Sequence, residues 1–348
     1  MAKTTDRTEH PLVALVGGGT LLAREIREVL GEQKPAPRVQ LVSAAADGST
    51  ILAAEDDETV VMVPLNAESF DGAKAAFLAA TPSTSRRAAK FCPKDGPVLI
   101  DLTGALEERP GARLRAPSAE PSLGAPSSPA GSAASPNRPQ VIAHPAAIAL
   151  TMLLVRLSKV APLRGSVIHI FEPASERGQQ GLDELQQQTV AVLSFKKLKT
   201  EVFDAQLGFN LLARYGEEAV EPLENIEQRV ERHLASLLAG WPGIPMPSLR
   251  VIQAPVFHGH SFSVWVEFEN NPDTGGLAEK LGRELARQDI DVRPDDPPTN
   301  AGIAGHSGIS VGAISADANN SRACWLWMVA DNLRLAAENS VAVAREVL

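Results

Sequence analysis

Cysteine is scarce in this sequence. Cys92 and Cys324 are the only two among 348 residues, and neither belongs to a CxxC motif or stands beside a histidine. Disulfide-stabilised secreted domains need several paired cysteines, so this usage fits a protein of the reducing cytoplasm. We expect both cysteines to be buried, unreactive side chains.

Long apolar runs and basic clusters are also missing. No stretch approaches the ~20 uninterrupted apolar residues that a membrane-spanning helix needs, and the start, MAKTTDRTEHP, has no apolar signal core. The net charge is −9, and no basic block offers a surface for nucleic acid. We therefore expect a cytoplasmic protein with neither a membrane nor a nucleic-acid partner.

The remaining composition is that of an ordinary folded protein. Hydrophobic residues make up 44% of the chain and charged residues 22%, which is typical of soluble globular proteins. Because domains usually hold roughly 100–200 residues, the length predicts two of them.

The N-terminal pattern is that of a strand, a glycine turn and a helix. An apolar run at 12–16 is followed by a turn and by a helical pattern in which Leu22, Ile26, Val29 and Leu30 share a face. The turn consists of Gly17, Gly18, Gly19 and Thr20. Such glycines let a pyrophosphate approach the backbone at the start of the helix, which indicates dinucleotide binding; the alternative is an ordinary tight turn.

Alternating elements follow. The sequence predicts strands at 39–43, 60–65 and 98–101, with helices at 69–79 and 83–91 between the later ones. This order is typical of a Rossmann-like α/β domain with a parallel sheet. Residues 116–136, within a biased segment at about 110–139, are almost entirely Ala, Pro, Ser and Gly, and we expect a disordered or loosely held insertion there.

The second half has an α+β pattern. Helices are predicted at 146–159, 178–194, 226–238, 277–288 and 332–347, and strands at 166–171 and 310–315, with a short apolar piece at 325–329. The stretch 251–269 is predicted as a half-buried strand because Phe262, Val264, Val266 and Phe268 alternate with polar residues.

His260 lies at the start of that alternation, between Gly259 and Ser261. A histidine there is suited to proton transfer, although a packed structural histidine is an alternative. A metal site is a further alternative, because His258 and His260 share one face of a strand, with His144 and His306 elsewhere; ordinary surface histidines are the more common case.

Several segments together resemble the aspartate-semialdehyde dehydrogenase family. They are VALVGGGTLLAREI, VLIDLTGAL, VIAHPAAIALTML, EPASERGQQGLDELQQQT, QAPVFHGHS and WMVADNLRLAAENSVAVAREVL. The resemblance implies reduction of an aspartyl phosphate with NADPH through a cysteine thioester. It implies a dinucleotide-binding domain at 1–142, a catalytic and dimerisation domain at 143–324, a C-terminal segment at 325–348 whose helix packs back on the first domain, and a homodimer formed through the second sheet.

The family's reactive positions are altered in this sequence. The resemblance aligns Ala147 with the nucleophilic cysteine and Glu172 with a glutamine that orients the acyl group. It aligns Gln253 and Glu107 with arginines that bind substrate anions, and only His260, the acid/base, is retained. A methyl group cannot replace a thiolate nucleophile.

The cofactor positions are altered as well. The resemblance implies NADP or NAD as cofactor, held by the glycine turn, Leu21, Ser43 and Asn332. The family's arginine after the second strand, which binds the adenosine 2′-phosphate, is missing from Ser43-Ala44-Ala45-Ala46, which removes the basis for preferring NADP. Asn332 could instead fix the start of the last helix.

Two functions remain in view. The pattern is similar to the cysteine-less paralogues of the family called Usg proteins, which predicts a catalytically degenerate dimer. The alternative is an NAD(P)-dependent oxidoreductase that acts on an aldehyde or oxo group and uses His260 and Glu172 as an acid/base pair.

Overall fold

A computed structural model describes residues 10–45, 51–55, 58–121, 138–270, 277–286, 288, 290–293 and 296–348. These residues form two compact units. The first contains the described residues up to 121 together with 138–143 and 336–348, and the second contains the described residues of 144–335.

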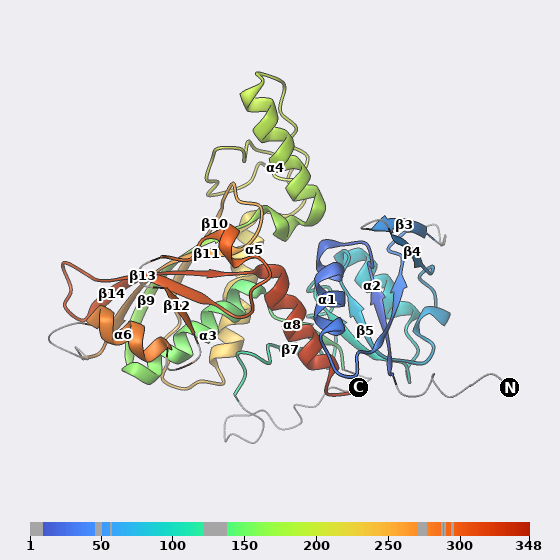
Figure 1. The fold of residues 1–348 in the computed structure, drawn as a ribbon, viewed down its shortest axis with the longest axis horizontal. Coiled ribbons are helices and arrows are strands. Elements are labelled where there is room, and N and C mark those ends of the chain that lie inside the picture. Colours follow the sequence, from blue (N-terminus) through green and yellow to red (C-terminus); the bar gives the residue numbers. More distant parts are fainter. Residues whose placement is uncertain are drawn as a thin grey trace. The chain divides into compact units, whose positions relative to one another are not determined.

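The first unit is built on a six-stranded sheet in the order β2-β1-β5-β6-β8-β7 (Figure 1). All five strand pairs are parallel. The strands are β1 (Leu12–Val16), β2 (Arg38–Val42), β5 (Ala73–Leu78), β6 (Val98–Asp101), β7 (Arg113–Arg115) and β8 (Gln140–Ile142), and the helices are α1 (Leu21–Gly31) and α2 (Pro82–Phe91). The predicted Rossmann-like parallel sheet is confirmed.

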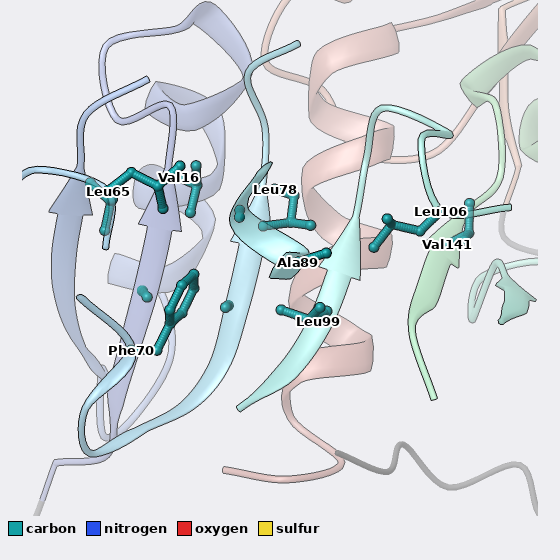
Figure 2. Close-up of a cluster of buried hydrophobic side chains, with 12 residues drawn as sticks. Val16, Leu65, Phe70, Leu78, Ala89, Leu99, Leu106 and Val141 are labelled. Atoms are coloured by element: carbon teal, nitrogen blue, oxygen red, sulfur yellow. The ribbon is translucent and has the colours of Figure 1, made fainter. Parts of the chain in front are cut away.

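The core of this unit lies between the sheet and the segments that cover it. Val16, Leu78 and Leu99 point from β1, β5 and β6 toward Phe70 and Leu106 (Figure 2). All five side chains are buried, and such burial stabilises a side chain of this size by about 1.5–3 kcal/mol.

The predicted helix at 69–79 is wrong. The segment contains a short 3₁₀ turn (Glu68–Phe70) and the strand β5. Four successive residues of β5, from Ala75 to Leu78, are fully buried, so the strand shows no alternation, and its alanines favour a helical interpretation.

The predicted strand at 60–65 is confirmed in part. Residues 58–62 form β4 (Glu58–Met62), which pairs antiparallel with β3 (Ile51–Glu55) in a two-stranded sheet. The next residue, Val63, forms an isolated parallel bridge with Val42 of β2, so the apolar run meets the parallel sheet at this point.

The segment predicted as a loose insertion begins inside the sheet. Strand β7 pairs with β8, and Arg115 at its end binds both Glu120 at 3.0 Å and Glu346 at 2.5 Å. Ala116 is fully buried, so 113–121 belongs to the unit rather than to an insertion. The remainder, 122–137, lies outside the described residues.

The second unit contains a mixed six-stranded sheet in the order β10-β9-β11-β14-β13-β12. Its strands are β9 (Leu163–Glu172), β10 (Ser248–Gln253), β11 (His260–Phe268), β12 (Asp291–Arg293), β13 (Ser310–Ala316) and β14 (Ala323–Ala330). The helices are α3 (Pro145–Val160), α4 (Gly178–Leu193), α5 (Leu223–Leu238), α6 (Leu277–Ala286), α7 (Asn300–Ile303) and α8 (Asn332–Ala344), of which 336–344 belongs to the first unit. α3, α5 and α6 pack against the sheet, and α4 stands away from it (Figure 1).

The stretch 251–269 is two strands rather than one. β10 runs parallel to β9, and β11 runs antiparallel to it. The loop between them ends at Gly259, whose φ is +81° and whose added Cβ would lie 2.9 Å from Ile303. A residue with a side chain is therefore excluded immediately before His260.

In the described part of the chain, no helix is long and apolar enough to cross a membrane.

We expect Phe262→Ala to lower the free energy of unfolding of the second unit by about 3–5 kcal/mol, because Phe262 is fully buried on β11. Urea denaturation followed by tryptophan fluorescence measures this unit, since all four tryptophans lie in it. Val220→Ala, at a residue that is 87% exposed, should change the value by no more than about 0.5 kcal/mol. Equal stability of the two variants would contradict the packing.

Candidate functional site

Three of the predicted site residues lie in a row at one end of the second sheet. Gln253 on β10 pairs with Glu172 on β9. On the other side of β9, Ser261 pairs with Phe171, so the antiparallel register brings His260 opposite Glu172. All three residues are buried, which makes this sheet end a polar site inside an apolar unit.

His260 faces a second histidine and a glutamate. Its ring centroid lies 5.7 Å from that of His144, and its Nε2 lies 3.9 Å from Oε1 of Glu176. Nε2 of His144 lies 3.8 Å from the other carboxylate oxygen. Nε2 of His260 is buried without a hydrogen-bond partner among the described residues.

Both imidazoles are held in the neutral form. Burial lowers the pKa of His260, against the opposing effect of Glu176 and Asp331. Burial also lowers the pKa of His144 well below its ordinary value, and His260 adds to this. Nδ1 of His144 accepts a hydrogen bond from the Ala146 amide at 3.2 Å, which places its proton on Nε2, toward Glu176.

Glu176 was not identified from the sequence. Asn332 fixes it by donating from Nδ2 to Oε1 at 2.9 Å, and the same Asn332 accepts a hydrogen bond from the Gly259 amide at 3.1 Å. Asp331, rather than Asn332, caps α8, because its Oδ1 accepts from the amides of Leu333 and Arg334. The helix-start interpretation of Asn332 is therefore wrong.

A ladder of alternating charges starts at Glu172. Nη2 of Arg177 lies 3.2 Å from Oε1 of Glu172, its Nη1 lies 2.7 Å from Oε2 of Glu221, and Arg229 binds the other Glu221 oxygen. Glu172 has no exposed surface, and its Oε2 has no hydrogen-bond partner in the part of the chain that the structure describes.

Burial sets the protonation of this ladder. It raises the pKa of Glu172 to about 8, more than the neighbouring Arg177 lowers it. For Arg177, burial opposes the charge, but the carboxylates of Glu172 and Glu221 outweigh it and raise the pKa of the guanidinium. Arg177 therefore stays charged, while Glu172 can hold a proton at neutral pH.

The amide of Gln253 is fully used within the chain. Its Oε1 accepts from the Tyr215 hydroxyl at 2.6 Å, and its Nε2 donates to the carbonyls of Glu172 at 2.8 Å and Ala254 at 3.1 Å. Gln253 is thus a structural link between strands, with no donor directed toward a ligand.

Ala147 is fully buried in the first turn of α3, the helix that His144 caps. Its side chain carries no reactive atom. Cys324 is buried on β14, where burial raises its thiol pKa to about 12. Cys92 is half-buried in the first unit rather than buried as predicted, and burial also raises its pKa. Neither thiol is a ready nucleophile at neutral pH.

Metal ligation finds no support in the described residues, which contain no cluster of three or more His, Cys, Asp or Glu side chains able to hold an ion. His258 and His306 do not join His144 and His260 in such a cluster.

The glycine turn in the first unit forms a second polar site. Gly17 has a φ of +91°, an added Cβ there would lie 2.7 Å from that of Ala80, and its amide bonds the Val42 carbonyl at 2.9 Å. Thr20 caps α1 by accepting from the Ala23 amide at 3.1 Å. In the described ranges, no acceptor bonds the amides of Gly19, Leu21 and Leu22.

Three free amides at the start of an 11-residue helix fit a pyrophosphate, which would accept from them at the positive end of the helix dipole. Ser43, at the end of the neighbouring β2, is buried and accepts from the Ala45 amide at 3.0 Å. Its hydroxyl therefore shapes the loop beside the turn.

Comparison with known proteins identifies the family of both units. Residues 158–335 match the semialdehyde dehydrogenase dimerisation domain, and residues 12–127 match the semialdehyde dehydrogenase NAD binding domain. The chain belongs to the semialdehyde dehydrogenase family.

Individual members of the semialdehyde dehydrogenase family are similar over most or nearly all of the chain. A USG-1 protein homolog from Pseudomonas aeruginosa is 31% identical over 344 residues, 97% of each chain. An aspartate-semialdehyde dehydrogenase from Rickettsia bellii is 30% identical over 60% of this chain and 62% of its own. The structure of a probable aspartate-semialdehyde dehydrogenase from Pseudomonas aeruginosa superposes with a TM-score of 0.80 at 27% identity, covering 97% and 98% of the two chains.

Membership of the semialdehyde dehydrogenase family confirms the resemblance drawn from the sequence motifs. The strand register places Glu172, Gln253 and His260, three residues that the resemblance aligned with family site positions, at one end of the second sheet. Sequence reasoning missed Glu176, Arg177 and Tyr215, although the Glu-Arg pair at 176–177 follows Glu172 closely in the sequence. Glu107 belongs to the first unit.

We expect the contribution of Glu172 to the stability of the second unit to fall as the pH rises from about 4.5 to about 8, because folded Glu172 keeps its proton over this range whereas the unfolded residue loses it; the lowered pKa values of His144 and His260 act in the opposite direction. Glu172→Gln, which is neutral at every pH, should flatten this dependence. Thermal unfolding followed by tryptophan fluorescence at several pH values measures it. Glu224→Gln, on the exposed side of α5, is the matched control and should retain the wild-type dependence; parallel curves for wild type and Glu172→Gln would refute the assignment.

Proposed function

We propose that this chain is a catalytically degenerate member of its family that does not form the thioester. The observation that carries the proposal is Ala147 at the family's cysteine position, buried in the first turn of α3. Without a thiolate the covalent path is closed. The similarity to a USG-1 protein homolog along the whole chain supports the same conclusion.

Other positions that the resemblance aligns with the family's site also support the proposal. Gln253, at one family arginine position, uses its amide to bond Tyr215 and two carbonyls. Arg177, which contacts Glu172 in this row, is bound by Glu172 and Glu221 and is therefore not available to a substrate anion. Glu107, at the other arginine position, would repel an anionic substrate.

The first unit supports continued binding of NADP or NAD. The glycine turn presents three free amides at the start of α1. A bound nicotinamide cofactor would supply hydride chemistry. The residues of this chain that would hold its pyrophosphate are Gly19, Leu21 and Leu22.

A second candidate is an NAD(P)-dependent oxidoreductase that acts on an aldehyde or oxo group. Its support is the pair His260 and Glu172 at adjacent strand ends, where burial leaves a neutral imidazole as base and a protonated carboxyl as acid. However, the carboxylate that contacts the His260 ring is that of Glu176, whose Oε1 lies 3.9 Å from Nε2.

We expect the purified chain to produce no NADPH from aspartate semialdehyde, phosphate and NADP across neutral and mildly alkaline pH. Ala147→Cys, which restores the thiol but neither arginine, should remain inactive in the same assay. The Bacillus subtilis aspartate-semialdehyde dehydrogenase serves as the positive control. Phosphate-dependent turnover that follows the wild-type chain through purification would overturn the proposal; phosphate-independent turnover lost in His260→Ala and Glu172→Gln would favour the second candidate.

We propose a homodimer formed through the second sheet. Residues 158–335 match a dimerisation domain. On the sheet face away from the buried core, Val167 and Trp325 are each 40% exposed, and Trp265 pairs with both. The indole N–H groups of Trp265 and Trp325 both donate to Asp317, which fixes the two rings beside each other. Together with Val167 the rings form an apolar surface suited to a second copy of the chain.

Trp325→Lys should convert the dimer to a monomer, because it places a charge at the centre of this surface. Light scattering coupled to size exclusion measures the mass. Val61→Lys, at a residue that is 55% exposed in the first unit, is the control and should stay dimeric. A wild-type monomer, or a dimeric Trp325→Lys, would contradict the interface.

A further inference from the structure

The outer face of α4 changes from polar to apolar along the helix. Its residues Asp183, Gln186, Val190 and Leu193 recur at spacings of three and four, so they lie on one face, and all four are exposed. Val190 is 56% exposed and Leu193 69%. Because α4 stands away from the sheet of its unit (Figure 1), this apolar end is turned to solvent. Exposed apolar side chains at the end of a projecting helix are typical of an interaction surface.

Phe195 extends the apolar end in a strained backbone conformation. Its amide bonds the Val192 carbonyl at 3.3 Å, and the amide of Lys196 bonds the Ala191 carbonyl at 2.9 Å, which closes the helix. The residue at this place in a helix end is usually Gly, because its backbone is left-handed. Phe195 adopts that conformation with a φ of +54° and is 98% exposed. A strained aromatic side chain in water is stabilised when a second surface covers it.

The chain that follows α4 holds the helix rigid. The buried carboxylate of Glu184 accepts from the amides of Val202 at 2.6 Å and Phe203 at 3.3 Å. The buried amide oxygen of Gln188 accepts from the Leu207 amide at 2.6 Å. The returning segment therefore lies along the inner side of the helix and leaves the outer face exposed. A surface that is already ordered loses little conformational entropy on binding.

The outer face has opposite charges at its two ends. Lys196 and Lys197, both exposed, follow the apolar end, whereas Asp183 lies near the helix start. The Asp183 carboxylate accepts from Nε2 of Gln179 at 2.7 Å, and both side chains are exposed. Asp183 is seven residues before Val190, and Lys197 is seven residues after it. The charges are thus placed symmetrically about Val190.

We propose that α4 packs antiparallel against α4 of a second copy of this chain, with Val190 at the twofold axis. In this arrangement Asp183 of one copy lies opposite Lys197 of the other, and the apolar side chains meet between the two charge pairs. The occupant is a second copy because one outer face supplies both charges and the apolar centre, as a twofold contact requires.

This contact is separate from the tryptophan surface of the second sheet and does not depend on the loss of catalysis. It involves few side chains, so it is weaker than an interface of standard size. At the dilution of size exclusion the sheet-formed dimer remains the main species. At higher protein concentration the α4 contact joins two such dimers.

A cysteine at the twofold axis tests the geometry, because the same residue of two copies meets there. In a Cys92→Ser background, mild oxidation of Val190→Cys at high protein concentration should give a covalent dimer on a non-reducing gel. Gln179→Cys, exposed on the same helix and about 16 Å from the axis, is the matched control and should not crosslink. No crosslink at Val190→Cys, or equal crosslinking of both variants, would overturn the proposal.

The same crosslink separates this contact from the sheet interface. Val190→Cys should still crosslink when Trp325→Lys is added, because the α4 contact uses no residue of the sheet. Loss of the crosslink in that variant would overturn a separate contact. Absence of the sheet-formed dimer in the wild type, with the crosslink retained, would leave the α4 contact supported and contradict the sheet interface alone.

Exchanging the charges tests the pairing. Sedimentation equilibrium should show that Asp183→Lys and Lys197→Glu each weaken the association through α4 by at least about tenfold, because two symmetric pairs become repulsive. The double variant restores opposite charges and should recover the wild-type association. Glu224→Lys, the same charge change as Asp183→Lys at an exposed residue of α5, is the control and should have little effect. A double variant as weak as the single ones, or an equal effect of the control, would overturn the pairing.

Discussion

A carboxylate with no exposed surface constrains the whole end of the second sheet. Glu172 closes β9, and a buried carboxyl group, whether ionised or protonated, is tolerated only where charges or hydrogen bonds surround it. Arg177 provides that charge, and Arg177 in turn needs Glu221, which needs Arg229 on α5. This series of ion pairs therefore holds together three segments, which are the chain after β9, the segment before α5 and α5 itself.

The two sites of the molecule differ in how many of their polar groups are bonded within the chain. The glycine turn presents three free amides at the start of a helix, which is what phosphate recognition requires. In the second unit, the amide of Gln253 is bonded to Tyr215 and to backbone carbonyls, and Arg177 is bound by Glu172 and Glu221. Nε2 of His260, which has no hydrogen-bond partner among the described residues, is the exception.

Local patterns predicted the elements whose exposure alternates and missed those whose environment is set by distant residues. β11 was visible because Phe262, Val264 and Val266 alternate with polar residues. β5 was not, since a strand buried on both faces has no period. Glu176 was missed for a related reason: His260, which it contacts, lies far away in sequence, and the only local signal was its position close behind Glu172.

Because Arg115 pairs with Glu346, the unit that is synthesised first cannot complete its folding first. The first unit is completed only by residues 336–348, which are made after the entire second unit. Arg115, at the end of the edge strand β7, is almost fully buried in the folded unit. During translation it has no Glu346 to pair with until roughly two hundred further residues have been synthesised. The second unit can close before the first, so the domain that begins the chain is the last to be finished.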